Sequence, residues 1–156
     1  MPRVVIIDTS CLIIFQKIGE LDLLQKVYGY VSITPEVAKE FSEEVPAWII
    51  IESTKDKKYQ NFLETQIDQG EASVIALAKE KESYLLLLDD LKARKLALKL
   101  NLKFTGALGV IHKAKQMGAL KNIKPIIEQL QATDFRISEN IIFELLRINK
   151  ENDDRY

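Results

Sequence analysis

The stretch that most constrains the fold is Tyr84-Leu-Leu-Leu-Leu-Asp89-Asp90, in which four leucines are followed by two adjacent carboxylates. A short apolar run without alternation is typical of a strand buried on both faces of a parallel sheet. A helix is the alternative, but the run is short and lies between two segments with helical periodicity. Ligands of parallel α/β sheets bind beyond the carboxyl ends of the strands. Asp89 and Asp90 are therefore expected at such a crevice.

A second strand with the same kind of ending is predicted near the N-terminus. Residues 4–7, Val-Val-Ile-Ile, are β-branched and lead directly to Asp8. A helical segment opens at Cys11, and Thr9 or Ser10 is available as its N-cap. The order strand, turn, helix is that of a βα unit, so Asp8 should end one buried strand as Asp89 ends another.

The helix predicted after Thr34-Pro35 carries two candidate acids. At about 100° per residue, Glu40 lies about 60° from Val37, at the edge of the apolar stripe. Glu44 lies nearer that stripe, at the point where Pro46 is expected to end the helix. Helical phase alone does not choose between Glu40 and Glu44.

Another helix is predicted from Asp68-Gln-Gly-Glu71 to about Lys81. Glu71, Ile75 and Ala78 are spaced i, i+4 and i+7, so the Glu71 carboxylate shares a helix face with core residues. This helix therefore supplies a further acid that points toward the protein interior.

The rest of the chain alternates between helices and short strands. Strands are expected over 30–34 and 102–105, with a strand or edge element at 48–51, and helices over 20–27, 59–67, 91–100, 108–117, 122–131 and 139–148. No linker, repeat or low-complexity segment divides the chain, so one α/β domain over residues 1–156 is predicted. The helices at about 122–150 are appended to it, and the tail at 150–156 should be frayed.

Charge, cysteine content and hydropathy limit the partners and the cellular location that can be expected. The 22 basic and 23 acidic side chains nearly cancel, so any RNA partner must be held by a local patch or by metal. Cys11 is the only cysteine, which rules out an internal disulfide and suits a reducing compartment. No apolar run approaches the roughly 20 residues of a membrane span, and the N-terminus lacks the layout of a signal peptide. A cytoplasmic location is expected.

Separate elements thus offer five carboxylates: Asp8, Glu40, Glu71, Asp89 and Asp90. Converging carboxylates repel one another unless a hard cation neutralises them, and oxygen-only ligands suit Mg²⁺ or Mn²⁺. A metal held in this way can activate water and stabilise the leaving oxygen in phosphodiester hydrolysis. Each acid alone also has a plain structural interpretation as a helix cap, a turn residue or a surface side chain. The combination favours the functional interpretation.

The order of the motifs resembles that of the PIN-domain ribonucleases, especially the branch of VapC-type toxins from bacterial and archaeal toxin–antitoxin pairs. The matching segments are 5–10, 34–40, 68–72, 88–94 and 104–110, followed by Ala114-Lys115 and Gly118. The resemblance implies a three-layer α/β/α PIN-like fold with a central, mainly parallel sheet. It also implies an Mg²⁺- or Mn²⁺-dependent endoribonuclease, a small antitoxin partner and a homodimer, for which the last two helices are the suspected surface.

The same resemblance distributes roles among the acids. Asp8, Glu40, Glu71 and Asp90 match the catalytic quartet, which selects Glu40 over Glu44. Asp89 belongs to the metal-binding set, although relatives often have a neutral polar residue there. Glu71 stands where many relatives carry aspartate, which moves the carboxylate about one methylene farther out.

Five further residues are candidates for supporting roles. Thr9 and Ser10 could hydrogen-bond an acid or a metal-bound water. Arg94 lies about one helical turn beyond Asp90, from which it could orient the acids or contact a substrate phosphate, but an ordinary surface arginine is an equal alternative. Lys92 and Lys95 could belong to a basic patch for RNA, although solvated helix faces explain them equally well.

Three functional hypotheses follow. The first is a metal-dependent ribonuclease, toxin-like and neutralised by an antitoxin. The second is a catalytically inactive PIN-like module that binds nucleic acid or protein, favoured by the near-neutral charge and by Glu71. The third, a phosphatase with Asp8 as nucleophile, is weaker because that chemistry usually needs a second acid two residues on, where this chain has Ser10.

Overall fold

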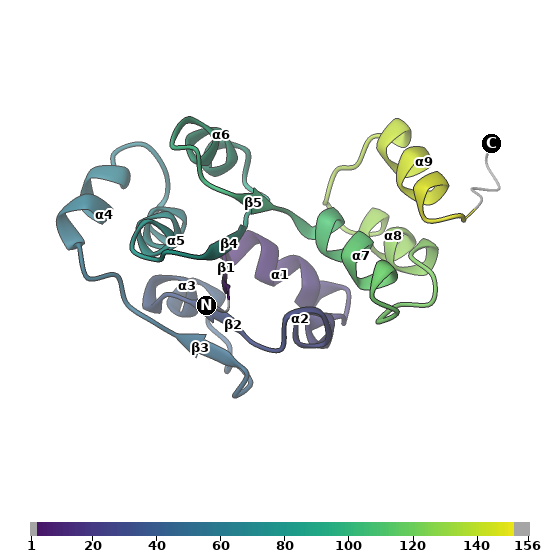
Figure 1. Cartoon of the computed structure of the whole chain (residues 1–156), viewed down its shortest axis with the longest axis horizontal. Helices are drawn as coiled ribbons and strands as arrows, with labels where there is room; N and C mark the ends of the chain where they lie inside the picture. Colours follow the sequence, from purple (N-terminus) through teal and green to yellow (C-terminus); the bar gives the residue numbers. More distant parts are fainter. Residues whose placement is uncertain (1–2, 152–156) are drawn as a thin grey trace.

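An all-parallel sheet of five strands forms the centre of the protein in a computed structural model that describes residues 3–151 (Figure 1). The strands are β1 (Val4–Ile7), β2 (Val31–Ile33), β3 (Ile49–Ile51), β4 (Tyr84–Leu87) and β5 (Phe104–Thr105). They lie in the order β3-β2-β1-β4-β5, and each neighbouring pair is parallel. The predicted fold class is confirmed.

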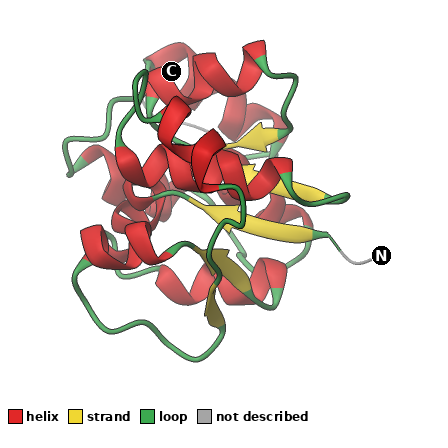
Figure 2. Ribbon diagram, turned by 90° about the vertical axis from the view of Figure 1, so that its left-hand side faces the viewer, coloured by secondary structure: helices red, strands yellow, loops and turns green. Residues whose placement is uncertain are grey.

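Helices cover both faces of this sheet (Figures 1 and 2). In Figure 1, α1, α2 and α7 lie on one side and α3 and α5 on the other, while α8 and α9 lie beyond α7. The helix bounds are α1 (Thr9–Lys17), α2 (Leu21–Tyr28), α3 (Pro35–Phe41), α4 (Lys57–Leu63), α5 (Gln69–Lys79), α6 (Leu91–Lys99), α7 (Ala107–Gln116), α8 (Lys124–Gln131) and α9 (Glu139–Ile148). The result is a three-layer α/β/α architecture.

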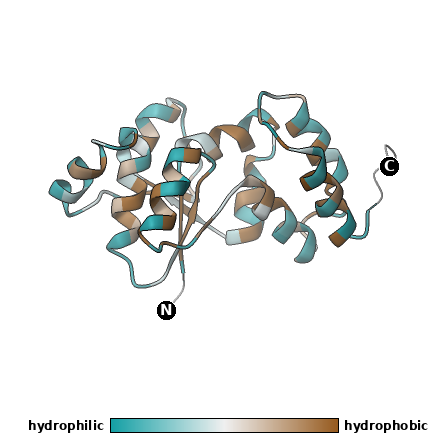
Figure 3. Ribbon diagram, turned by 90° about the horizontal axis from the view of Figure 1, so that it is seen from above, coloured by the Kyte–Doolittle hydropathy of each residue, from teal (hydrophilic) through white to brown (hydrophobic). Residues whose placement is uncertain are grey.

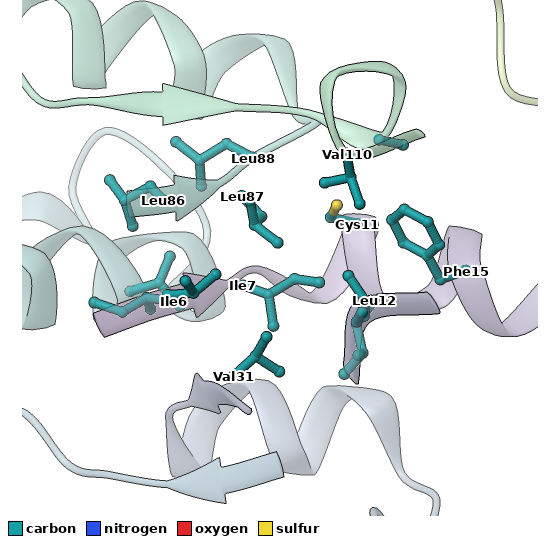
Figure 4. Packing of buried hydrophobic residues seen from close by; sticks show 14 of the residues in the cluster. Ile6, Ile7, Cys11, Leu12, Phe15, Val31, Leu86, Leu87, Leu88 and Val110 are labelled. Atoms are coloured by element: carbon teal, nitrogen blue, oxygen red, sulfur yellow. The ribbon is translucent and has the colours of Figure 1, made fainter. Parts of the chain in front are cut away.

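The core is densest around the two central strands, β1 and β4. Ile6 and Ile7 pair in register with Leu86 and Leu87, and all four side chains are fully buried. Leu12 and Phe15 of α1 and Val110 of α7 pack beside them (Figure 4), and the brown, hydrophobic parts of the helices in Figure 3 lie largely on their inner faces. Because both faces of these strands are covered, each strand is a continuous apolar run rather than an alternating one.

The order of the strands reverses between β1 and β4. From β1 the chain continues to β2 on one side of the sheet, whereas β4 leads to β5 on the other side. Asp8 directly follows β1 and donates its backbone N–H to the Leu87 carbonyl at 3.0 Å. The residues after β4, Leu88-Asp89-Asp90, therefore lie next to Asp8 at the topological switch point, which is where such folds bind ligands.

Some boundaries differ from those predicted. Helix α3 ends at Phe41 rather than near Pro46, because Ser42 adopts a left-handed backbone conformation (φ 57°) and terminates it. Glu44 therefore lies exposed in the following loop instead of on a helix face. The segment at 48–51, for which a strand or an edge element was expected, forms the edge strand β3.

The chain stays attached to the fold beyond α9. The Glu151 carboxylate accepts hydrogen bonds from the backbone N–H groups of Ile123 (2.8 Å) and Lys124 (3.1 Å), and it pairs with Lys115 Nζ at 2.6 Å. The rest of the tail expected to be frayed, 152–156, lies outside the described residues. Within 3–151, no helix combines the length and apolar character that crossing a membrane requires.

Candidate active site

Asp8 is the most deeply buried acid of the site. It is the N-cap of α1, a role expected for Thr9 or Ser10, and its Oδ1 accepts the Cys11 N–H at 2.8 Å. Its Oδ2 is buried and has no hydrogen-bond partner among the described residues. The pKa of Asp8 is raised to about 8, mainly by burial and also by the nearby charges of Asp89 and Glu71, while the backbone N–H groups of Cys11 and Asp89 act in the opposite direction. This oxygen needs either a proton or a cation.

Glu40 reaches the site from α3. Its Oε1 accepts a hydrogen bond from Thr9 Oγ1 at 2.6 Å, which joins α3 to the first residue of α1. Gly70, at the start of α5, makes this approach possible, because a Cβ at that position would collide with Glu40 Oε1 and lie 3.1 Å from Thr9 Oγ1. The structure therefore brings Glu40 to this edge of the sheet, as the motif order predicted, and leaves Glu44 away from it.

Glu71 is half-buried in the first turn of α5. Its Oε2 accepts the backbone N–H of Asp68 at 3.2 Å, as in a capping box. The pKa of Glu71 is raised to about 7, mainly by burial and also by the negative charges of Asp90, Asp68 and Glu40. Glu71 is thus close to an acid of its own helix start, Asp68, and to acids from two other segments, Glu40 and Asp90.

Asp89 and Asp90 point to different helix N-termini. Asp90 caps α6, with Oδ2 accepting the Ala93 N–H at 3.0 Å. Asp89 accepts the Ala107 N–H at the start of α7, at 3.2 and 3.1 Å from its two oxygens. Burial raises the pKa of Asp89, although the Cys11 thiol, the Ala107 N–H and the Arg94 charge act in the opposite direction.

All five predicted acids therefore gather at the carboxyl edge of β1 and β4. Within residues 3–151, no three His, Cys, Asp or Glu side chains already have the geometry of a metal site. All five acids accept a hydrogen bond from a neighbouring donor through at least one oxygen, but Asp8 Oδ2 has no partner among the described residues. An all-carboxylate set with one orphaned, buried oxygen fits a hard divalent cation.

Two hollows flank the acids. The first, about 450 Å³, is lined by the α4–α5 loop and the start of α6, including Asp68, Glu71, Asp90 and Lys92. The second, about 360 Å³, has Asp89 and Arg94 in its wall. Each hollow therefore includes at least one acid of the cluster.

The supporting candidates have different surroundings. Arg94 lies over the Phe104 ring, 5.2 Å from its centroid, and its charge lowers the pKa of Asp89. Lys92 lies at the rim of the first hollow, Lys95 is exposed on α6, and Ser10 is partly exposed in the first turn of α1.

The single histidine and the single cysteine both contact other parts of the protein. Asn149 Nδ2 lies 2.9 Å from His112 Nδ1 and joins α7 to the segment after α9. The Cys11 side chain is fully buried, and its burial raises the pKa of the thiol. Cys11 is therefore shielded from solvent, whereas His112 is partly exposed.

Sequence reasoning missed two residues beside the acids. Phe135 and Arg136 lie in the loop between α8 and α9 and line the second hollow with Asp89 and Arg94. The only sequence signal was an aromatic residue next to an arginine in a segment without periodicity. Where such a loop lies depends on the packing of α8 and α9, which no local pattern reveals.

Comparison with known proteins gives the family. A family model described as DUF3368, a PIN domain, matches residues 4–151. No curated protein and no solved structure matches the chain. PIN domains are generally nucleases, and they typically use divalent metals. The match spans nearly the whole sequence and includes every element that carries a candidate acid. The chain belongs to the PIN-domain family.

Proposed function

We propose that this protein is a metal-dependent endoribonuclease whose acids at the β1–β4 switch point hold Mg²⁺ or Mn²⁺. The observation that supports this most directly is Asp8, whose Oδ2 is buried without a partner beside four other carboxylates. A fixed, desolvated oxygen of this kind costs free energy unless a ligand uses it. Such unfavourable groups are concentrated at functional sites.

Each acid has a distinct role in this proposal. Asp8 presents Oδ2 to the ion while the Cys11 N–H holds Oδ1 in place. Glu40, oriented by the Thr9 hydroxyl, together with Glu71 and Asp90, completes the set, and Asp89 supports it from the α7 side. When bound, the ion would supply an activated water and neutralise the leaving oxygen. Arg94 limits the repulsion between Asp89 and an incoming phosphate.

The test is cleavage of single-stranded RNA with Mn²⁺ or Mg²⁺, and with chelator in place of the metal. We expect metal-dependent cleavage by the wild type and a loss of about a hundredfold or more in Asp8→Asn, because the carboxylate is then replaced by a weak neutral ligand. Asp22→Asn is the matched control, since Asp22 is an exposed acid in the first turn of α2. Equal cleavage by Asp8→Asn and wild type would overturn the proposal.

A second candidate function is a PIN-like module that binds nucleic acid or protein without cutting. All five acids accept a hydrogen bond from a neighbouring donor, and no three His, Cys, Asp or Glu side chains within residues 3–151 form a ready ligand set. Calorimetric titration with Mn²⁺ separates the two functions. Binding that is lost in Glu71→Gln supports the nuclease, whereas absence of binding in the wild type supports the inactive module.

The toxin role is a further part of the proposal and rests on the order of the motifs. It requires a small antitoxin that binds the chain and suppresses its activity. Co-expression with the product of a small adjacent reading frame, if there is one, tests it by relief of growth arrest.

A homodimer would use α9, where Ile141 and Ile148 are about half exposed, at 51% and 50%. Analytical ultracentrifugation of the wild type and of Ile148→Glu tests this surface.

A further inference from the structure

The second hollow differs in kind from the first. Its lining comes from α6, the β5–α7 segment, the loop between α8 and α9, and α9 itself, and it includes Arg94, Phe135, Arg136 and Ile141. Figure 1 shows the α8–α9 connection beside the segment between β5 and α7. Asp89 lies in the wall of this hollow and also in the acid cluster, so the two are directly connected.

The loop that supplies the aromatic and basic side chains is held by its own hydrogen bonds. Thr133 Oγ1 donates to the Leu130 carbonyl at 2.6 Å and accepts the Phe135 N–H at 3.1 Å. Phe135 and Ile137 are partly buried against the core, whereas Arg136 between them is exposed. The backbone therefore presents Phe135 and Arg136 from a defined position.

Charge separates the two hollows. The first has Glu64, Asp68, Glu71 and Asp90 in its wall against one cation, Lys92, so it repels a polyanion. The second has Arg94 and Arg136 against one acid, Asp89. A phosphodiester strand that reaches the acids is therefore favoured on the side of the second hollow.

We propose that the second hollow is a nucleotide subsite that binds one residue of single-stranded RNA next to the scissile phosphate. Phe135 supplies the face on which the base stacks, and Arg136 and Arg94 supply the cations for the flanking phosphate. An aromatic ring combined with arginines is the usual means of holding unpaired nucleotides without strong sequence preference. A volume of about 360 Å³ lies in the range of small-molecule sites. The inference rests on the proposed ribonuclease function.

Binding can be measured apart from cleavage in the Asp8→Asn background of the full chain. The probe is a fluorescein-labelled, single-stranded RNA, titrated and followed by anisotropy. We expect Phe135→Ala and Arg136→Gln each to weaken binding about tenfold, as loss of one stacked base or one phosphate contact does. The matched control is Arg147→Gln, because Arg147 is exposed on α9 and pairs with Glu144. It should change binding less than twofold.

A second measurement distinguishes stacking from loss of folding. An abasic nucleotide placed next to the cleaved bond should weaken binding to the protein that retains Phe135, but should add little to the effect of Phe135→Ala. Arg136→Gln should also reduce the dependence of binding on salt.

The outcomes separate this inference from the function on which it rests. If the wild type cleaves RNA with metal and Asp8→Asn does not, but Phe135→Ala and Arg136→Gln bind and cleave like the wild type, the nucleotide subsite is refuted and the nuclease stands. If those two variants instead lose binding only to a protein partner, the hollow is a protein-docking site and the inference fails. If Asp8→Asn cleaves normally, the proposed function fails first.

Discussion

Asp8, Asp90 and Glu71 each accept a backbone N–H in the first turn of a helix. Taken singly, they are ordinary caps, stabilised by the positive end of the helix dipole. The helices that they cap all begin at the same edge of the sheet, however, so capping also brings the carboxylates together. The structural and the functional interpretations of these acids are therefore compatible.

The pKa values of Asp8 and Glu71 predict how the stability of the metal-free protein depends on pH. Both are raised above their ordinary values, to about 8 and about 7. The folded protein therefore binds protons that the unfolded chain releases, and the free energy of unfolding should fall as pH rises from about 4 to about 8. Asp8→Asn removes the larger contribution. In chelator, we expect the melting temperature of this variant to exceed that of the wild type by several degrees near pH 8 and by less near pH 5. For a protein of this size, about 1 kcal/mol of stability corresponds to about 2–4 °C in melting temperature.

Added Mn²⁺ should reverse the order of the melting temperatures of the wild type and Asp8→Asn at high pH. The ion neutralises the acids only in the folded state, so it should raise the melting temperature of the wild type and leave Asp8→Asn nearly unchanged. Differential scanning fluorimetry with chelator and with Mn²⁺ measures both effects. Equal responses of the two proteins to pH and to Mn²⁺ would show that the pKa of Asp8 is not raised in the folded protein and that Asp8 does not bind the ion.

At the scale of elements, the start of α5 determines how closely α3 and α1 can pack against it and against each other. Gly70 lies against the Thr9–Glu40 hydrogen bond, with no room for a side chain between them. Gly106 has a similar role for Asp89, since a Cβ there would collide with Asp89 Oδ1. Both glycines have negative φ, so close approach rather than backbone conformation accounts for them.

The variant Gly70→Ala tests this arrangement. In an ordinary helix the change would stabilise the fold by up to about 1 kcal/mol, because alanine has the higher helix propensity. Here the new Cβ should displace Glu40, and we expect lower affinity for Mn²⁺ and about a tenfold or larger loss of RNA cleavage.

Combining this change with Glu40→Ala provides the control. Without the Glu40 carboxylate the collision disappears, so Gly70→Ala should become neutral or stabilising in that background. Thermal melts and Mn²⁺ titrations of the two single variants and the double variant measure the coupling. If the two changes are simply additive, Gly70 does not position Glu40.

The elements differ in how much of them could be predicted from sequence. β1 and β4 were predictable because burial on both faces leaves an uninterrupted apolar run ending in an acid. The end of α3 was not, because it depends on the left-handed Ser42, a residue without a strong preference for that conformation. Asp8 was expected beside a cap rather than as the cap itself. The positions of Phe135 and Arg136 depend on tertiary packing alone.

At the scale of the whole molecule, the sheet with its covering helices can be distinguished from the pair α8 and α9. The pair α8 and α9 lies at one end of the long axis, beyond α7 (Figures 1 and 3), and its buried apolar side chains continue the core of the sheet and its covering helices. Ile126, Leu130, Ile142 and Leu146 bury the inner faces of α8 and α9. The second hollow lies where these two parts meet, so its shape depends on how firmly α8 and α9 are held.

Glu151 is the polar anchor of this end of the molecule. Its carboxylate accepts the Ile123 and Lys124 N–H groups at the start of α8 and pairs with Lys115 of α7. Burial opposes ionisation, but these three partners outweigh it and lower the pKa of Glu151. Its contribution to stability is therefore present above the ordinary glutamate pKa and is lost as pH falls through the lowered value.

We expect Glu151→Gln to lower the free energy of unfolding by about 1–3 kcal/mol at neutral pH, since it removes a charged acceptor from a buried set of donors. Amide hydrogen exchange should accelerate in α8 and α9 while β1 and β4 stay protected, because the sheet does not depend on this anchor. The control is Glu144→Gln, whose exposed pair with Arg147 should matter little. If exchange accelerates equally in β1 and β4, the two parts unfold as one unit, and the second hollow is as rigid as the core.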